Sequence, residues 1–151
     1  MNSHRTHFKV STLNLFNYIV PPNAFYESEN IYSDRQWRRK NDWISRQLTQ
    51  LQPDIVGLQE VFSPNALQTL LHENDLPYFA TVSAPGKRSD YVYDKPVVAL
   101  ASKFPITSQG AVEPSAQVLS DLKLDPDFSF SRPPLRVEIA VDGIGKVLVY
   151  V

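Results

Sequence analysis

The sequence predicts an α/β or α+β domain in which helices cover one face of a mixed β-sheet. Two amphipathic segments with helix-start signals are separated by short apolar runs of strand length. A pair of alternating runs around a glycine-containing turn closes the sequence, as in a β-hairpin. Strands and helices that alternate in this way are typical of a layered fold, with the helices packed on a sheet.

Bulk composition agrees with one folded domain. The chain has 151 residues, of which 42% are hydrophobic and 21% charged, so disorder is not expected. Its net charge of −1 argues against a uniformly basic surface but leaves a local basic groove open. The absence of cysteine excludes disulfides and thiolate metal sites. We find no signal peptide or membrane-spanning run, and we expect a cytoplasmic protein.

The first third contains a strand and the clearest helix. Residues 8–14 alternate as a strand does, and Pro21-Pro22 excludes its continuation. Residues 33–51 form the helix, with Ser33 and Gln36 matching a capping box. Its apolar stripe consists of Trp37, Ile44, Leu48 and Leu51. Its basic residues mostly lie off that stripe and are interpreted as a solvated face: Arg38, Arg39, Lys40 and Arg46.

The middle of the chain predicts further strands around a second helix. Residues 54–59 are apolar on both faces, as in an interior strand. Ser63-Pro64 marks the start of the second helix. Residues 78–83 and 96–102 are predicted strands, and 86–95 between them a polar, aromatic loop.

The last third is predicted to be irregular before it forms a hairpin. Residues 107–134 contain many prolines and at most a helical turn within 116–124. Residues 135–141 and 146–151 flank the turn sequence "DGIG". Because the final run is strongly apolar, we expect it to be covered by a later part of a longer protein or by a partner chain.

Polar side chains follow two of the predicted strands at the point where each strand ends. Glu60 closes the buried run "PDIVGLQEV", and Asn14 closes the first strand. If these strands are neighbours, both side chains lie at the same sheet edge, where their oxygens could bind Mg²⁺ or Mn²⁺. Alternatively, Glu60 merely leaves the sheet into solvent, and Asn14 is an ordinary turn residue.

These motifs also resemble a known family. "STLNLFNY" (11–18) and "QPDIVGLQEV" (52–61) resemble the first two motifs of the endonuclease/exonuclease/phosphatase superfamily, a group of metal-dependent phosphoesterases that includes deoxyribonuclease I and sphingomyelinases. "KPVVALASKFPI" (95–106) resembles a later strand, with Lys95-Pro96 in place of the usual glycine, and "FSRPPLRVEIAVDGIGKVLVYV" (130–151) resembles the next hairpin. The most specific element is "DIVGLQE".

The resemblance implies roles for particular residues. Glu60 matches the glutamate that binds the catalytic Mg²⁺ (or Mn²⁺), and Asn14 matches the asparagine next to that metal. Gln59 is then expected to support Glu60 from a second shell. Arg132 falls near a family arginine that contacts the substrate phosphate. Asn17 is a further candidate in the second shell, although an ordinary turn is the preferred interpretation there.

The resemblance further implies that residues 1–151 are a single domain, the N-terminal portion of the family's domain. The corresponding fold is half of a four-layer α/β/β/α sandwich. The family's later motifs, with their histidine, Asp-x-Asn and Asp-His residues, do not occur in this sequence. We therefore expect a Mg²⁺-dependent phosphoesterase in the full-length protein and little or no activity of this chain.

The expected substrate is a phosphoester, either a nucleic acid or a small or lipid phosphodiester, and the sequence does not choose among them. A different class of function is a non-catalytic binding or self-assembling module. Such a module would form a homodimer through an apolar sheet left exposed by the half-sandwich. It would not need a carboxylate at the end of a buried strand, so Glu60 favours the enzyme.

Overall fold

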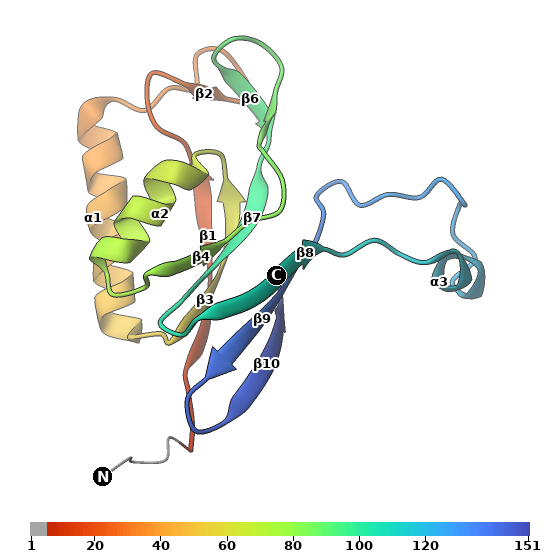
Figure 1. The fold of residues 1–151 in the computed structure, drawn as a ribbon. Helices are drawn as coiled ribbons and strands as arrows, with labels where there is room; N and C mark the ends of the chain where they lie inside the picture. Colours follow the sequence, from red (N-terminus) through yellow and green to blue (C-terminus); the bar gives the residue numbers. More distant parts are fainter. Residues whose placement is uncertain (1–5) are drawn as a thin grey trace.

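The centre of the fold is a four-stranded sheet with the strand order β1-β3-β7-β4 (Figure 1). In the computed structural model, which describes residues 6–151, these strands are β1 (Val10–Tyr18), β3 (Ile55–Val61), β7 (Val97–Ser102) and β4 (Tyr78–Ala80). β1 and β3 run parallel, whereas β7 is antiparallel to both β3 and β4. The predicted mixed sheet is confirmed, and each predicted strand of this sheet is present.

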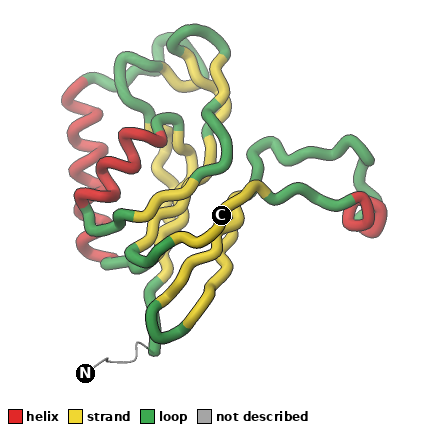
Figure 2. Tube along the Cα trace, viewed as in Figure 1, coloured by secondary structure: helices red, strands yellow, loops and turns green. Residues whose placement is uncertain are grey.

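Two helices cover one face of this sheet, as predicted (Figures 1 and 2). They are α1 (Asp34–Leu51), which begins with the capping box of Ser33 and Gln36, and α2 (Pro64–Glu73). Their apolar sides pack with the sheet in one core, which includes Ile44, Leu48, Leu67, Leu71, Val56, Leu58, Ala99 and Ala101. Within residues 6–151, neither helix is long and apolar enough to cross a membrane.

Two of the helix predictions are wrong. Leu51 was placed in the buried stripe, but it is the last helical residue and is 39% exposed. Lys40 was assigned to the solvated face with Arg38, Arg39 and Arg46. It is instead half-buried, because its ammonium group donates to the backbone carbonyls of Leu15 and Phe16.

A second sheet packs on the other face of the first. It consists of β8 (Ile106–Ala111), β9 (Leu135–Val141) and β10 (Gly145–Tyr150), all antiparallel in the order β10-β9-β8. Alternate residues of β9 form a second core with the central sheet, which includes Leu135, Val137, Ile139, Val141, Ile55, Ala80 and Leu100. The layers are therefore helices, sheet and sheet, consistent with part of a four-layer sandwich.

The segments predicted to be loops contain strands. Residues 107–134 were expected to be irregular, but most of β8 lies there; its side chains are mostly polar and exposed, so they show no apolar alternation. Residues 86–95 contain β5 (Gly86–Lys87) and β6 (Val92–Lys95). β6 pairs with β5 on one side and with β2 (Ala24–Phe25) on the other. This small sheet packs near the end of β3, where Phe62 meets the rings of Tyr26 and Tyr93.

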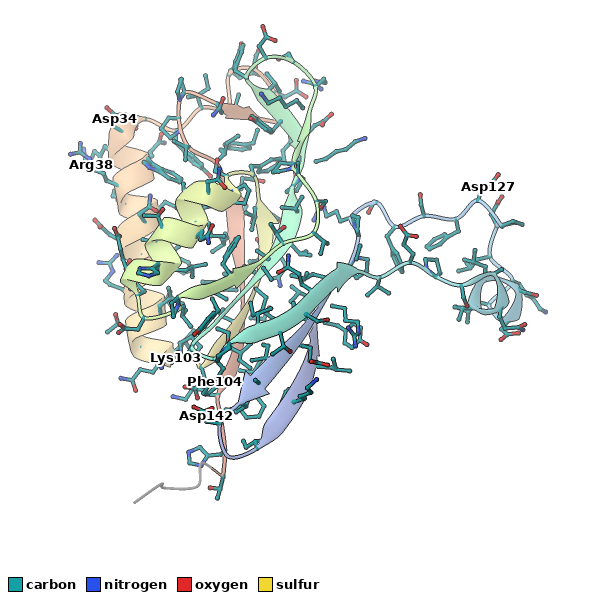
Figure 3. All side chains as sticks on the ribbon, in the orientation of Figure 1. Asp34, Arg38, Lys103, Phe104, Asp127 and Asp142 are labelled. Atoms are coloured by element: carbon teal, nitrogen blue, oxygen red, sulfur yellow. The ribbon has the colours of Figure 1, made fainter. Side chains whose placement is uncertain are left out.

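Residues 112–134 form an arm that extends away from the sheets and carries α3 (Ala116–Asp121), within the range predicted for a helical turn (Figures 1 and 2). Figure 3 places Asp127 far out on this arm. At its base the Val112 backbone N–H donates to the Pro134 carbonyl at 2.8 Å. The arm is therefore an excursion between two neighbouring strands.

The two cores predict a contrast between two leucines. Leu100 is fully buried between the sheets, whereas Leu148 on β10 is 48% exposed. We expect Leu100→Ala to lower the free energy of unfolding by about 2–5 kcal/mol, because it leaves a cavity. Leu148→Ala should change it by no more than about 0.5 kcal/mol. Urea denaturation measures both, and equal losses would contradict the assigned packing.

Candidate active site

Glu60 and Asn14 meet at the carboxyl ends of β3 and β1. The two strands are parallel, and their register pairs Asn14 with Gln59, the residue before Glu60. The Asn14 Nδ2 donates to Glu60 Oε1 at 3.1 Å. The backbone N–H of Asn17 donates to Glu60 Oε2 at 3.0 Å. Both carboxylate oxygens are thus held by β1, although the two strands lie far apart in the sequence.

A bulge in β1 makes this contact possible. The register passes from Asn14–Gln59 directly to Tyr18–Val61, so three residues of β1 lie opposite Glu60 alone. Phe16 (φ 49°), Asn17 (φ 60°) and Glu60 (φ 60°) adopt left-handed backbone conformations there. For residues with side chains, each such conformation costs on the order of 1–3 kcal/mol and is concentrated at functional sites.

The carboxamide of Asn14 is fixed at both ends. Its Oδ1 accepts from the Phe16 backbone N–H at 2.8 Å, while its Nδ2 donates to Glu60. Because only the oxygen can accept from an N–H, these contacts determine how the amide is oriented. A carboxamide oxygen can accept twice, so Oδ1 retains the capacity for one further interaction on the exposed side of the strand.

Lys40 of α1 and Tyr32 lie behind the bulge. The Lys40 Nζ donates to the carbonyls of Leu15 and Phe16, both at 2.8 Å, and the Tyr32 hydroxyl donates to the Phe16 carbonyl at 3.0 Å. Burial raises the pKa of Tyr32, and the negative charge of Glu60 raises it further. Burial lowers the pKa of Lys40, and Glu60 opposes that change. The site therefore couples one carboxylate, one ammonium group and one phenol.

Comparison with known proteins assigns the chain to a family. Residues 28–140, about three quarters of the sequence, match the Endonuclease/Exonuclease/phosphatase family. The chain belongs to this family. The matched segment contains Glu60, Gln59 and Arg132, whereas Asn14 and Asn17 precede it. No curated protein was found to match the sequence.

Solved structures support the same fold for this endonuclease/exonuclease/phosphatase family member. A β-hairpin deletion mutant of beta toxin from Staphylococcus aureus is 21% identical with a TM-score of 0.54, over 97% of this chain and 50% of that one. An endonuclease/exonuclease/phosphatase from Beutenbergia cavernae DSM 12333 is 18% identical with a TM-score of 0.57, over 95% and 37%.

A third such structure is an endonuclease/exonuclease/phosphatase family protein from Leptotrichia buccalis C-1013-b. It is 14% identical with a TM-score of 0.53, over 95% of this chain and 52% of that one. This chain therefore spans about half or less of the length of the structures that it resembles.

The oxygen donors at this site fit a hard divalent cation such as Mg²⁺ (or Mn²⁺). Such ions need only one or two protein carboxylates, with water or substrate completing the shell. Glu60 is partly exposed, and a carboxylate can accept more bonds than the two from β1. Nearby, the side-chain Oδ1 of Asn17 is buried and accepts no hydrogen bond within residues 6–151. That part of the chain contains no cluster of three or more acidic or histidine side chains suited to a metal.

The other predicted site residues do not all contact Glu60. Gln59 exchanges hydrogen bonds with Thr12, and none of the hydrogen bonds described for residues 6–151 joins it to Glu60. Asn17 contacts Glu60 through its backbone, while its side chain is 7% exposed. Arg132 is exposed in the segment between α3 and β9. Within residues 6–151, the hydrogen bonds described for the Glu60 carboxylate come from the Asn14 side chain and the Asn17 backbone.

Lys40, Tyr32 and the backbone N–H of Asn17 were missed by the sequence analysis. Lys40 binds backbone carbonyls, and any residue type supplies a carbonyl, so the sequence carries no pairing signal for it. A usable signal lies in the helix itself: Lys40 follows Trp37 and precedes Ile44, which places it at the edge of the apolar stripe.

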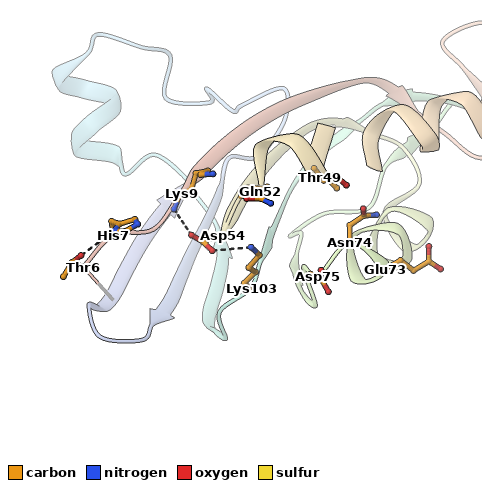
Figure 4. Close-up of a pocket in the computed structure, with 12 residues that line it drawn as sticks. Thr6, His7, Lys9, Thr49, Gln52, Asp54, Glu73, Asn74, Asp75 and Lys103 are labelled. Atoms are coloured by element: carbon orange, nitrogen blue, oxygen red, sulfur yellow. Dashed lines mark hydrogen bonds and ion pairs between the residues drawn. The ribbon is translucent and has the colours of Figure 1, made fainter. Parts of the chain in front are cut away.

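A cavity lies at the opposite end of β3 (Figure 4). It has a volume of about 880 Å³ and lies beside Asp54, which precedes β3. Glu60 is six residues further along the strand, roughly 20 Å away. Asp54 is already bound by Lys103 at 3.5 Å and by the Lys9 backbone N–H at 2.9 Å. We therefore take Glu60, whose carboxylate is partly exposed beside left-handed backbone, as the candidate site in preference to this cavity.

The electrostatic coupling predicts the response of two neighbours to loss of the Glu60 charge. A negative charge disfavours tyrosinate and favours the lysine ammonium. Glu60→Gln should therefore lower the pKa of both Tyr32 and Lys40. NMR pH titration of tyrosine Cζ and lysine Cε resonances measures the change, with Glu113→Gln on the arm as the control. Unchanged pKa values in Glu60→Gln would show that the carboxylate does not face these groups.

Proposed function

We propose that the protein to which this sequence belongs is a divalent-metal-dependent phosphoesterase, and that Glu60 and Asn14 form part of its metal site. The observation that supports this most directly is the Glu60 carboxylate itself. It stands at the end of a buried strand in a left-handed conformation, and β1 bonds to both of its oxygens. Family membership points to the same chemistry.

In this proposal the side chains have distinct roles. Glu60 binds Mg²⁺ or Mn²⁺, and Asn14 orients Glu60 while offering its Oδ1 to the ion or its water. When bound, the ion stabilises negative charge on the phosphoryl oxygens. Arg132 binds the substrate phosphate, for which its guanidinium group supplies paired donors. Asn17 supports the metal site through its backbone N–H, whereas Gln59 supports it indirectly, because its bonds to Thr12 tie β3 to β1 beside Glu60.

The proposed substrate class is a phosphoester: a nucleic acid, or a small or lipid phosphodiester or phosphomonoester. The N-terminal half of α1 exposes Arg35 and Arg38, which would favour an anionic molecule on that side. Figure 3 shows Arg38 pointing outward from α1 near its start.

We also propose that residues 1–151 are the N-terminal portion of a larger endonuclease/exonuclease/phosphatase domain. The chain spans 37–52% of the three similar structures. Within residues 6–151, the candidate site contains one carboxylate, that of Glu60, and no histidine that contacts it. On this basis the isolated chain should bind the ion and hydrolyse phosphoesters little or not at all.

The alternative is a non-catalytic module that associates with itself through the second sheet. Leu148 and Tyr150 are 48% and 60% exposed on β10, which offers an apolar surface and an edge that no other strand of residues 6–151 pairs with. A homodimer through this surface stays a prediction. The metal-site proposal is preferred because an assembly surface does not explain why Glu60 and two residues opposite it, Phe16 and Asn17, adopt left-handed backbone conformations.

Metal binding tests the proposal directly. The wild-type chain should bind Mn²⁺ or Mg²⁺ in a calorimetric titration. Glu60→Gln should weaken binding at least tenfold, because it removes the one carboxylate that residues 6–151 contribute to the proposed site. Asn14→Ala should weaken it less. Glu113→Gln removes an equal charge from the arm and should change nothing. Equal binding by wild-type and Glu60→Gln proteins would exclude Glu60 as the ligand.

Turnover tests the second part of the proposal. With bis(p-nitrophenyl) phosphate and Mg²⁺, the 151-residue chain should release p-nitrophenol at a rate close to that of buffer. Robust turnover that disappears in Glu60→Gln would disprove the expected inactivity and would at the same time establish Glu60 as catalytic.

A further inference from the structure

The Phe16–Asn17 peptide group connects α1 to the Glu60 carboxylate. Its carbonyl, from Phe16, accepts from Lys40 Nζ at 2.8 Å and from the Tyr32 hydroxyl at 3.0 Å. Its N–H, from Asn17, donates to Glu60 Oε2 at 3.0 Å. This planar peptide group is therefore hydrogen-bonded at both its oxygen and its N–H.

Planarity makes the two ends dependent on each other. In a trans peptide the carbonyl and the N–H point in opposite directions, so fixing one fixes the direction of the other. A cation at the oxygen also polarises the group and strengthens its N–H as a donor. Lys40 and Tyr32 therefore determine where the Asn17 N–H points and how strongly it binds Glu60.

The backbone here needs such support. Phe16 and Asn17 both have left-handed φ values, and a bulky aromatic residue disfavours that conformation. The Phe16 ring does not hold it, because that side chain is 73% exposed. Lys40 Nζ bonds to the Leu15 carbonyl as well, at 2.8 Å, and so bridges two successive carbonyls of the bulge.

Aromatic rings keep Lys40 in place. Its Nζ lies 5.1 Å from the centroid of the Tyr32 ring and 5.8 Å from that of Phe16. These distances suit cation–π attraction. Lys40 also belongs to the second turn of α1, a rigid element whose capping box starts at Ser33.

We propose that Lys40 and Tyr32 are positioning residues for Glu60, which act through the Phe16–Asn17 peptide group. Removal of the ammonium group frees the peptide to rotate out of the left-handed conformation. The Asn17 N–H then leaves Glu60 Oε2, and the carboxylate loses one of its two fixed contacts. The inference rests on the proposed function only where it concerns metal affinity.

The experiment compares substitutions in α1 and in the segment just before it. Lys40→Met removes the ammonium group and keeps an unbranched side chain, whereas Lys40→Arg retains several N–H donors. Arg39→Met removes one positive charge from the exposed neighbour and serves as the matched control. Tyr32→Phe removes only a hydroxyl group, so it tests the same peptide if Lys40→Met does not fold.

Two measurements are made on each variant. The first is amide hydrogen exchange of Asn17, referenced to Leu58 in the buried part of β3. The second is the dissociation constant for Mn²⁺. For Lys40→Met we expect Asn17 exchange at least tenfold faster with Leu58 unchanged, and Mn²⁺ binding roughly tenfold weaker. In Lys40→Arg both the slow Asn17 exchange and the Mn²⁺ affinity should be partly retained. Tyr32→Phe should change both quantities less than Lys40→Met does, and Arg39→Met should match wild type in both.

The outcomes separate this inference from the proposed function. If the wild-type chain fails to bind Mn²⁺, the proposed metal site is wrong, and Asn17 exchange still tests the positioning role. If Lys40→Met and Arg39→Met give the same Asn17 exchange, the positioning role is wrong. If Asn17 and Leu58 exchange faster together, Lys40 only stabilises the whole fold, which also overturns the inference.

Discussion

The parallel pairing of β1 with β3 positions both the cores and the candidate site. In the sequence β1 precedes α1 and β3 follows it. Their pairing brings the carboxyl ends of both strands to the same end of the sheet. The buried part of β3 contributes alternately to the helix-side core, through Val56 and Leu58, and to the sheet-side core, through Ile55. A shift of one residue would exchange the faces of β3 and separate Asn14 from Glu60, so packing and site geometry are maintained by one register.

Glu60 shows how a rigid sheet can present a flexible side chain accurately. Regular pairing would continue the pleat and turn successive side chains to opposite faces. The bulge in β1 instead gathers an amide side chain and a backbone N–H around one carboxylate. The unfavourable backbone conformations are tolerated because the next residue of each strand is firmly packed: Val61 is fully buried and Tyr18 almost fully buried.

The sequence was informative where the type and spacing of side chains determine the local structure. Capping at Ser33, the apolar run before Glu60 and the turn between β9 and β10 were all recognisable, and so was the family. It was uninformative where the backbone supplies the partner. The strand β8 pairs through backbone groups and shows polar side chains, and Lys40 binds carbonyls. The first strand was also predicted to end at Asn14, whereas β1 continues through the bulge to Tyr18.

The arm at residues 112–134 has a consequence for how the length of the chain can change. It joins two strands that are already neighbours, and the bond between Val112 and Pro134 closes it at the base. The entropy of closing such a loop grows only with the logarithm of its length, about 0.6 kcal/mol for each doubling. Residues can therefore be inserted or deleted near Asp127 without altering the register of β8 and β9. Arg132, close to the base, would keep its place through such changes in length.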